Sequence, residues 1–401
     1  MGRTAGAASA SASGASSPGR VSGPGERAES SESAAPAGPS GPRGTKKARR
    51  THRLRRALLA TLITGAVVVP LSGAARPEIP APEPAALAPV TAATLDEAYA
   101  ANRANAAEAS RMAAANGNRQ RAAADRAMAD PSRHFLTFDG RGPGLATEVF
   151  GDLAHADRIA VLVPGSDTSI DTYGRFRNAA RALHERLTRE APQGTRTAVV
   201  AWLGYETPGT ISATVATAGR AEDAAPKLRE FVRQLRAIPD RTSSAGETPG
   251  MSGPSSMSGT SSMSGPSKGS AEEGPHISLL CHSYGSVVCG RAASELDGDV
   301  DDIALVGSPG TGVDTAGALH TPARVWAARG GDDWVAEVPH VRFDLLGTTV
   351  GFGTDPMSPS FGARVFAAGD GGHSDYFRPG TTSLTNLTRI VLGETSEVTH
   401  G

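Results

Sequence analysis

Hydrophobic and polar positions follow two different periods along the central part of the chain. Short continuous apolar runs rich in β-branched residues are typical of strands buried on both faces of a sheet. Segments with apolar residues three or four positions apart are typical of amphipathic helices. Because the two kinds of segment alternate, we predict an α/β fold, a mainly parallel sheet with helices on both faces. The predicted strands are 158–165, 197–204, 276–283, 302–310, 324–330 and 364–369, and the predicted helices are 171–188, 220–238, 285–296 and 382–392.

Weaker signals precede this alternation. Residues 94–129 are rich in alanine, and Asn116-Gly117-Asn118 interrupts them. They predict a long helix or a helical hairpin. Residues 135–139 and 144–151 resemble a short antiparallel pair of strands. We therefore expect the α/β domain to follow an Ala-rich helical segment that packs on it.

Two segments have a biased composition. Residues 1–45 contain almost only Gly, Ala, Ser, Pro, Arg and Glu, so they bury too little apolar surface to fold, and we predict disorder. Residues 241–274 contain repeated Met-Ser-Gly units without an amphipathic period. They connect the end of a helix to the start of a strand, so we predict a disordered insertion at the sheet edge opposite the ligand-binding edge. The formal net charge of −1 gives no reason to expect a nucleic-acid partner.

Residues 46–75 have the order of an export signal. A basic cluster precedes an apolar run from Ala57 to Val69, which Pro70 and small residues follow. This order matches a secretory signal, and the run to Ala75 is also close to the length that spans a bilayer. We therefore predict an extracytoplasmic protein, either secreted after cleavage or membrane-anchored with a cytoplasmic N-terminus. The predicted divisions are a disordered extension at 1–45, a basic region with signal or anchor at 46–75, a Pro/Ala-rich linker at 76–93, a helical segment at 94–130, the α/β domain at 131–395 and a tail at 396–401.

The clearest chemical motif is Cys281-His282-Ser283-Tyr284-Gly285, between a predicted strand and a predicted helix. It resembles the G-x-S-x-G nucleophile elbow of α/β-hydrolases, a sharp turn that lifts a serine hydroxyl above the sheet. The positions two before and two after the serine must be small, because neighbouring backbone lies close. Gly285 satisfies this, and Cys281 is a mild departure. The motif predicts Ser283 as a nucleophile, against the alternative of a serine that only caps a helix. The two cysteines have neither a metal-binding nor a CxxC spacing, and they do not make a disulfide framework.

A serine nucleophile needs a base, which in this fold comes last in the order serine, acid, histidine. Three histidines lie beyond Ser283. His373 directly follows the last predicted strand, and two glycines before it leave its loop free to bring the imidazole over the serine. His340 precedes that strand and His400 is the penultimate residue, so both are in the wrong place. We predict His373 as the base.

The acid is expected after the strand at 324–330, where Asp332 and Asp333 follow directly. A carboxylate there can accept the imidazole N–H and stabilise the imidazolium. We prefer Asp333, and Asp332 stays open as the alternative. Asp355 and Asp370 are weaker candidates because neither directly follows this strand.

An oxyanion hole requires two backbone N–H groups. The residue after the nucleophile supplies one, which here is Tyr284. The second is expected from the loop after 158–165, where Gly165 permits a sharp turn and the Ser166 N–H is the candidate. The alternative is an ordinary turn between strand and helix.

Four motifs together resemble a known group of proteins. VLVPGS (161–166), WLGYETP (202–208), CHSYGS (281–286) and GHSDYF (372–377) are similar to an actinobacterial α/β-hydrolase family catalogued as a domain of unknown function. The resemblance covers roughly residues 94–392. It implies the α/β-hydrolase fold and a triad of Ser283, an aspartate after the seventh strand and His373. Family members often have glycine at the position of Cys281, and the family brings no established substrate.

These features favour hydrolysis of a small-molecule or lipid ester through an acyl-enzyme. An acyltransferase or peptidase with the same triad is the alternative, and a third is a catalytically inactive binding scaffold of the cell envelope. Candidate pocket segments are Leu203–Ser212 and Val335–Ala363, the latter an apolar lid or a hairpin packed on the sheet edge. No metal motif and no Gly-rich dinucleotide loop is present, so we expect no cofactor. The sequence carries no signal for the oligomeric state.

Overall fold

The computed structural model describes residues 79–239, 274–338, 343–345 and 348–401. All of them belong to one compact unit, Ser72–Gly401. The predicted disordered extension and export signal, most of the predicted insertion, and His340 lie outside the described residues. No helix among the residues described has the length and apolar character needed to cross a membrane.

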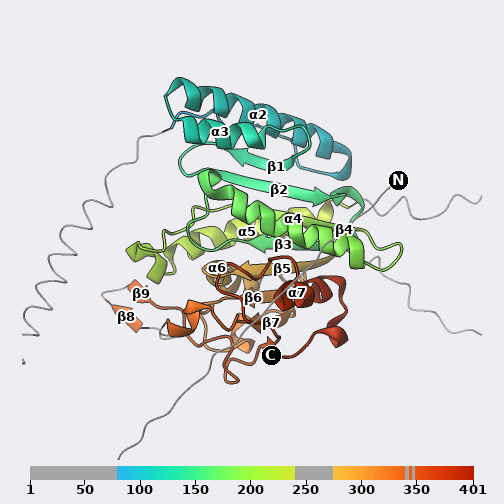
Figure 1. Cartoon of the computed structure of the whole chain (residues 1–401), viewed down its shortest axis with the longest axis vertical. Coiled ribbons are helices and arrows are strands. Elements are labelled where there is room, and N and C mark those ends of the chain that lie inside the picture. The colour runs from blue at the N-terminus through green and yellow to red at the C-terminus, as the bar shows by residue number, and fades with distance from the viewer. Residues whose placement is uncertain (1–78, 240–273, 339–342, 346–347) are drawn as a thin grey trace, which may run out of the picture. The chain divides into compact units, whose positions relative to one another are not determined.

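An eight-stranded sheet forms the centre of this unit, in the order β1-β2-β4-β3-β5-β6-β7-β10 (Figure 1). The first two strands run antiparallel to each other and β2 runs antiparallel to β4, while the six strands from β4 to β10 are parallel. This confirms the mainly parallel sheet of an α/β-hydrolase fold. The strands are β1 His134–Asp139, β2 Leu145–Gly151, β3 Arg158–Val163, β4 Thr197–Leu203, β5 His276–His282, β6 Asp302–Val306, β7 Arg324–Ala328 and β10 Arg364–Val365.

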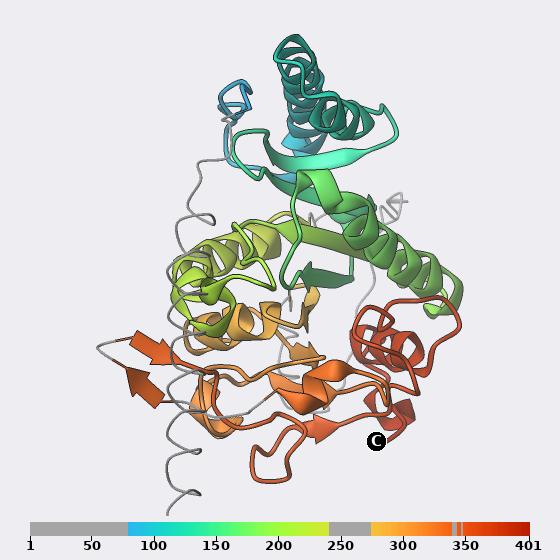
Figure 2. The ribbon, with the colours of Figure 1, turned by 60° about the vertical axis from the view of Figure 1, so that its left-hand side comes forward.

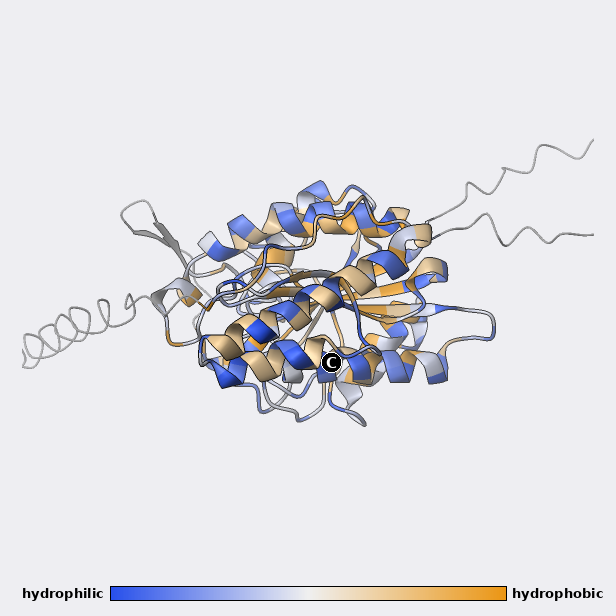
Figure 3. Ribbon diagram, turned by 90° about the horizontal axis from the view of Figure 1, so that it is seen from above, coloured by the Kyte–Doolittle hydropathy of each residue, from blue (hydrophilic) through white to orange (hydrophobic). Residues whose placement is uncertain are grey.

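Helices cover both faces of the sheet because its strands are apolar on both sides. In β3, Ile159, Val161 and Val163 pack into one core cluster and Ala160 and Leu162 into the other. The first cluster includes apolar residues of α5 (Gly219–Ala237) and α6 (Gly285–Ala292), the second those of α4 (Tyr173–Glu190) and α7 (Thr382–Leu392). Seen from above, hydrophobic strands lie between helices whose outer faces are hydrophilic (Figure 3). The predicted helix at 285–296 ends as a 3-10 turn, Ala293–Glu295.

The Ala-rich segment forms a helical hairpin of α2 (Leu95–Ala115) and α3 (Arg119–Met128). Gly117 turns the chain with a φ of +79°, and the Asn118 side chain caps α3 by accepting the N–H of Arg121. Small alanines let α2 lie close against β1, at the edge of the sheet (Figure 2). The buried Asn102 amide donates to backbone carbonyls of β1.

One strand is shorter than expected. β10 covers only two residues of the predicted 364–369, because the chain beyond it pairs with the C-terminal segment through an antiparallel bridge between Phe366 and His400. The backbone of His400 is therefore paired with that of Phe366. Within the predicted lid or hairpin, β8 (Phe343–Leu345) and β9 (Thr348–Val350) form a separate two-stranded antiparallel sheet.

Candidate active site

Ser283 occupies a sharp turn between β5 and α6. Its φ is +53°, a value that residues other than glycine rarely adopt. The turn is tight because the loop after β3 lies directly against it. A Cβ on Gly285 would lie 2.6 Å from the Val163 carbonyl oxygen, and one on Gly165 would lie 2.6 Å from the Ser283 Cβ. The backbone therefore presents the serine as a nucleophile elbow does.

The structure brings Ser283, His373 and Asp333 together from three loops at the carboxyl edge of the sheet. His373 Nε2 lies 2.9 Å from Ser283 Oγ, and His373 Nδ1 lies 2.9 Å and 3.1 Å from the two Asp333 carboxylate oxygens. Ser283 is 9% exposed and Asp333 is buried. This arrangement lets the imidazole take a proton from the serine while a carboxylate faces its second nitrogen.

The other acid and base candidates lie elsewhere. Asp332 is exposed beside the buried Asp333, and Asp370 is exposed too. Asp355 forms an ion pair with Arg329 at 2.8 Å. His400 is paired in the bridge described above.

Neutral donors surround the Asp333 carboxylate. The Tyr376 hydroxyl donates to Oδ2 and the Val335 N–H to Oδ1 at 2.9 Å. Burial opposes ionisation of Asp333, but the hydrogen bonds from His373, Tyr376 and Val335 outweigh it and hold the pKa of this carboxyl below its usual value. Asp333 is therefore an anion at neutral pH.

His282, the residue before the nucleophile, supports the His373 loop. Its Nε2 lies 2.7 Å from the His373 carbonyl oxygen, and its ring centroid lies 4.7 Å from that of His373. Burial lowers the pKa of His282 to about 4, so the ring is neutral and Nε2–H donates to the carbonyl. Sequence reasoning missed this role because the contact joins residues 91 positions apart.

The predicted oxyanion-hole donors lie on the two segments that meet at Ser283. The N–H groups of Ser166 and Tyr284 donate to no other residue of the described chain. Two hydrogen bonds connect the Ser166 loop to residues 202–208. The Tyr205 hydroxyl donates to the Pro164 carbonyl at 2.7 Å, and the Asp167 N–H donates to the Pro208 carbonyl at 3.0 Å.

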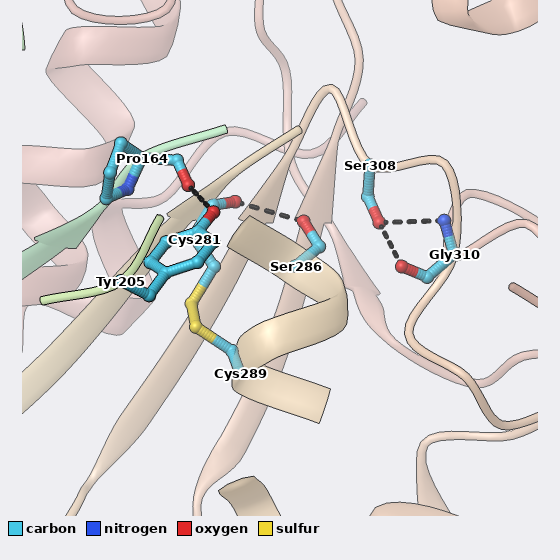
Figure 4. The surroundings of a disulfide bond; sticks show 7 residues. All are labelled: Pro164, Tyr205, Cys281, Ser286, Cys289, Ser308 and Gly310. Atoms are coloured by element: carbon cyan, nitrogen blue, oxygen red, sulfur yellow. Dashed lines mark hydrogen bonds between the residues drawn. A yellow bond between two sulfur atoms is a disulfide. The ribbon is translucent and has the colours of Figure 1, made fainter. Parts of the chain in front are cut away.

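A disulfide joins Cys281 to Cys289, with 6.5 Å between the Cα atoms (Figure 4). Both cysteines are fully buried. The bond ties the residue two positions before Ser283 to the second turn of α6. The expectation of no disulfide framework overlooked this single bridge, and the eight-residue spacing across a strand–turn–helix is the signal that could have indicated it.

Two apolar side chains are exposed near the site. Trp334 is 52% exposed with its ring 4.7 Å from that of His373, and Ile211 is fully exposed in the loop after β4. Ile211 follows Thr210, which donates to the Asp167 carboxylate of the loop that faces Ser283. Phe352 and Phe361, which were candidates for a lid, are instead buried in the core. Among the residues that the structure describes, no group of His, Cys, Asp and Glu is arranged to hold a metal ion.

Comparison with known proteins agrees with the fold. The chain matches the family described as alpha/beta hydrolase at residues 139–250 and 262–343. An uncharacterised protein of Mycobacterium tuberculosis is 25% identical over 276 residues, which cover 63% of this chain and 37% of the relative. An uncharacterised protein of Mycobacterium bovis is 28% identical over 201 residues, which cover 48% of this chain and 62% of the relative. The chain thus spans well under two thirds of the length of its first curated relative. The match to the family and these mycobacterial relatives confirm the resemblance to an actinobacterial α/β-hydrolase family of unknown function.

Solved structures show a more distant likeness. A predicted CIB-like hydrolase from Thermoplasma acidophilum has a TM-score of 0.36 and 13% identity, covering 66% of this chain and 96% of that one. Esterase PE8 has a TM-score of 0.36 and 16% identity, covering 62% of this chain and 97% of that one. Neither likeness bears on the substrate.

Proposed function

We propose that this chain, which has the α/β-hydrolase fold, is a serine esterase that acts through Ser283, His373 and Asp333. One observation carries the proposal: a buried carboxylate, an imidazole and a serine hydroxyl are connected by hydrogen bonds of 2.9 Å. A serine that only caps a helix has no need of this connection.

The chemistry follows from the positions of the atoms. His373 Nε2 takes the proton of Ser283 Oγ as the oxygen attacks the ester carbonyl, and Asp333 stabilises the imidazolium. The N–H groups of Ser166 and Tyr284 stabilise the oxyanion of the tetrahedral intermediate. As that intermediate collapses, the imidazolium returns the proton to the leaving alcohol and an acyl-enzyme forms on Ser283. Water, activated by His373, then releases the acid.

The exposed side chains at the site support an ester with an apolar group. Trp334 and Ile211 are the large hydrophobic residues of the described chain that face solvent, and both lie on loops next to the catalytic ones. An apolar substrate group that covered such side chains would gain binding free energy by removing their surface from water. Small-molecule or lipid esters are therefore the proposed substrates.

The disulfide supports an extracytoplasmic location. Disulfides persist in oxidising compartments and are rare in the cytosol. Secreted and membrane-anchored forms both satisfy this condition. Immunoblotting of membrane and culture fractions separates them, since full-length protein in the culture supernatant contradicts an anchor.

A fluorophosphonate probe tests the catalytic proposal directly. The wild-type chain should be labelled and should hydrolyse nitrophenyl esters, with longer acyl chains favoured over acetate. Ser283→Ala should abolish labelling and lower kcat/KM by about 10⁵-fold or more. Ser308→Ala is a matched control, because this buried serine lies in the loop after β6 and its hydroxyl is hydrogen-bonded to Gly310 of the same loop (Figure 4). Well-folded wild-type protein that is not labelled would instead support a binding scaffold.

A further inference from the structure

Tyr376 forms a closed set of hydrogen bonds with the loop that carries Asp333. Its hydroxyl donates to Asp333 Oδ2 and accepts the Gly330 N–H at 3.1 Å. The Asp333 N–H donates back to the Gly330 carbonyl at 3.1 Å. Tyr376 is buried, so no water competes for these bonds.

The same loop delivers both partners of Asp333. His373 and Tyr376 are three residues apart, and the turn between them is closed by hydrogen bonds between Gly372 and Asp375. A glycine gives the three groups room to meet: a Cβ on Gly307 would lie 2.8 Å from Asp333 Oδ2, 2.9 Å from Tyr376 Cε2 and 3.1 Å from His373 Nδ1. Asp333 therefore receives a base on one side and a hydroxyl on the other.

Tyr376 acts as a neutral donor. Burial first, and then the hydrogen bond to Asp333, raise the pKa of its hydroxyl well above the usual value, so it keeps its proton. His373 is the only ion-pair partner of Asp333 within the described ranges. The hydroxyl can thus share the negative charge of the carboxylate without neutralising it.

We propose that Tyr376 is a positioning residue of this site, which fixes the rotation of the Asp333 carboxylate and moderates the charge that it presents to His373. The proposal rests on the esterase function proposed above. With Val335 on Oδ1 and Tyr376 on Oδ2, the carboxylate has one orientation toward His373 Nδ1. Without the hydroxyl the carboxylate can rotate, and its full charge falls on the imidazolium.

Tyr376→Phe removes the hydroxyl and keeps the ring, whose centroid lies 5.7 Å from that of His282. A hydrogen bond to a charged group corresponds to about a 10-fold to 100-fold change in rate, so kcat should fall by that factor. KM should stay within about twofold, because the tyrosine does not reach substrate. The acid limb of the pH–rate profile should move to higher pH, because the imidazolium of His373 becomes more stable.

Tyr173→Phe is the matched control, because Tyr173 is equally buried but packs on Phe176 in another part of the core. It should leave kcat and the pH profile unchanged. If Tyr376→Phe does not fold, replacing Tyr376 with 3,5-difluorotyrosine keeps every hydrogen bond and strengthens the donor. The acid limb should then move to lower pH.

The outcomes separate this inference from the proposed function. If wild type is labelled by the fluorophosphonate but Tyr376→Phe keeps its kcat and pH profile, the inference is wrong and the esterase proposal stands. A loss of activity with only a lower melting temperature and an unmoved acid limb would also overturn it. If folded wild type is not labelled at all, the proposed function itself fails.

Discussion

Two histidine–aspartate pairs lie at opposite edges of the same sheet, and among the described residues only the histidine of one pair is hydrogen-bonded to a serine hydroxyl. At the carboxyl edge, His373 meets Asp333 beside Ser283. At the amino edge, His276, the first residue of β5, lies 2.9 Å from Asp302, the first residue of β6. Asp302 is as deeply buried as Asp333. A buried histidine–aspartate pair is therefore not in itself a sign of catalysis.

The partners of the two carboxylates explain the difference. Asp302 accepts two hydrogen bonds of 2.7 Å from the Arg324 guanidinium and one of 2.7 Å from the Trp326 indole. A permanent cation neutralises it, so little charge is left to stabilise an imidazolium. Asp333 has only neutral donors besides His373 in the described chain, and it keeps its charge for the base.

The direction of the pKa shift does not distinguish the pairs. Burial opposes ionisation of Asp302 too, and hydrogen bonds from His276, Arg324 and Trp326 outweigh it, so the pKa of Asp302 is also lowered. A perturbed carboxyl marks a candidate, and the charge of its partners decides whether it can serve a base.

Among changes to the two histidine–aspartate pairs, Asp333→Asn should have the largest effect. Its amide cannot stabilise the imidazolium and favours the wrong imidazole tautomer, so kcat should fall by about 10³-fold to 10⁴-fold with the fold intact. Ester hydrolysis and circular dichroism measure the two quantities. Asp332→Asn, at the exposed neighbouring position, should keep full activity. Equal losses from both substitutions would refute the assignment of the acid.

Asp302→Asn should lower the stability of the fold and leave kcat nearly unchanged, the opposite of Asp333→Asn. It leaves the Arg324 charge without its carboxylate, and because the Arg324 side chain is 35% exposed we expect a loss of about 2 to 3 kcal/mol in the free energy of unfolding. Urea denaturation measures this loss, and kcat of the folded enzyme should stay within about twofold. A large fall in kcat at unchanged stability would show that the amino edge takes part in catalysis.

A smaller effect concerns His282, at the carboxyl end of the strand that His276 begins. Its pKa of about 4 lies below the usual value for histidine, so between these pH values the unfolded chain binds a proton that the native chain does not. Because protonation of His282 favours the unfolded chain, it should lower the free energy of unfolding by about 2 kcal/mol at pH 5 and have little effect at pH 7. His282→Gln keeps an N–H for the His373 carbonyl without titrating. Thermal melts should show a smaller decrease from pH 7 to pH 5 in this variant, and an equal decrease would contradict the assignment.

The linear order of the catalytic candidates could be predicted because parallel strands end at one edge. Ser283, Asp333 and His373 each follow a strand, so their proximity depends only on correct strand prediction and on the sheet being parallel. The choice of Asp333 over Asp332 rested on a short pattern. In the structure Asp333 is buried beside His373 and Asp332 is exposed, which is the arrangement that the choice predicts.

Contacts between side chains could not be predicted in the same way. Tyr376 and His282 reach their partners through loop geometry that no period in the sequence encodes. Cys281 and Cys289 depend on the angle between a strand and a helix. For β10, the run at 364–369 predicted a full strand, but from Phe366 onward the chain also pairs with the C-terminal segment.

The disulfide also has a consequence for chemical analysis. No lysine or arginine lies between Cys281 and Cys289, and the flanking basic residues are Lys268 and Arg291. Trypsin therefore releases Ser283 and both cysteines in one peptide, 269–291. Its mass spectrum reports two properties at once, because an adduct on the serine adds mass and a bridged peptide is lighter by the two thiol hydrogens. A single digest can thus show which redox form of the chain reacts.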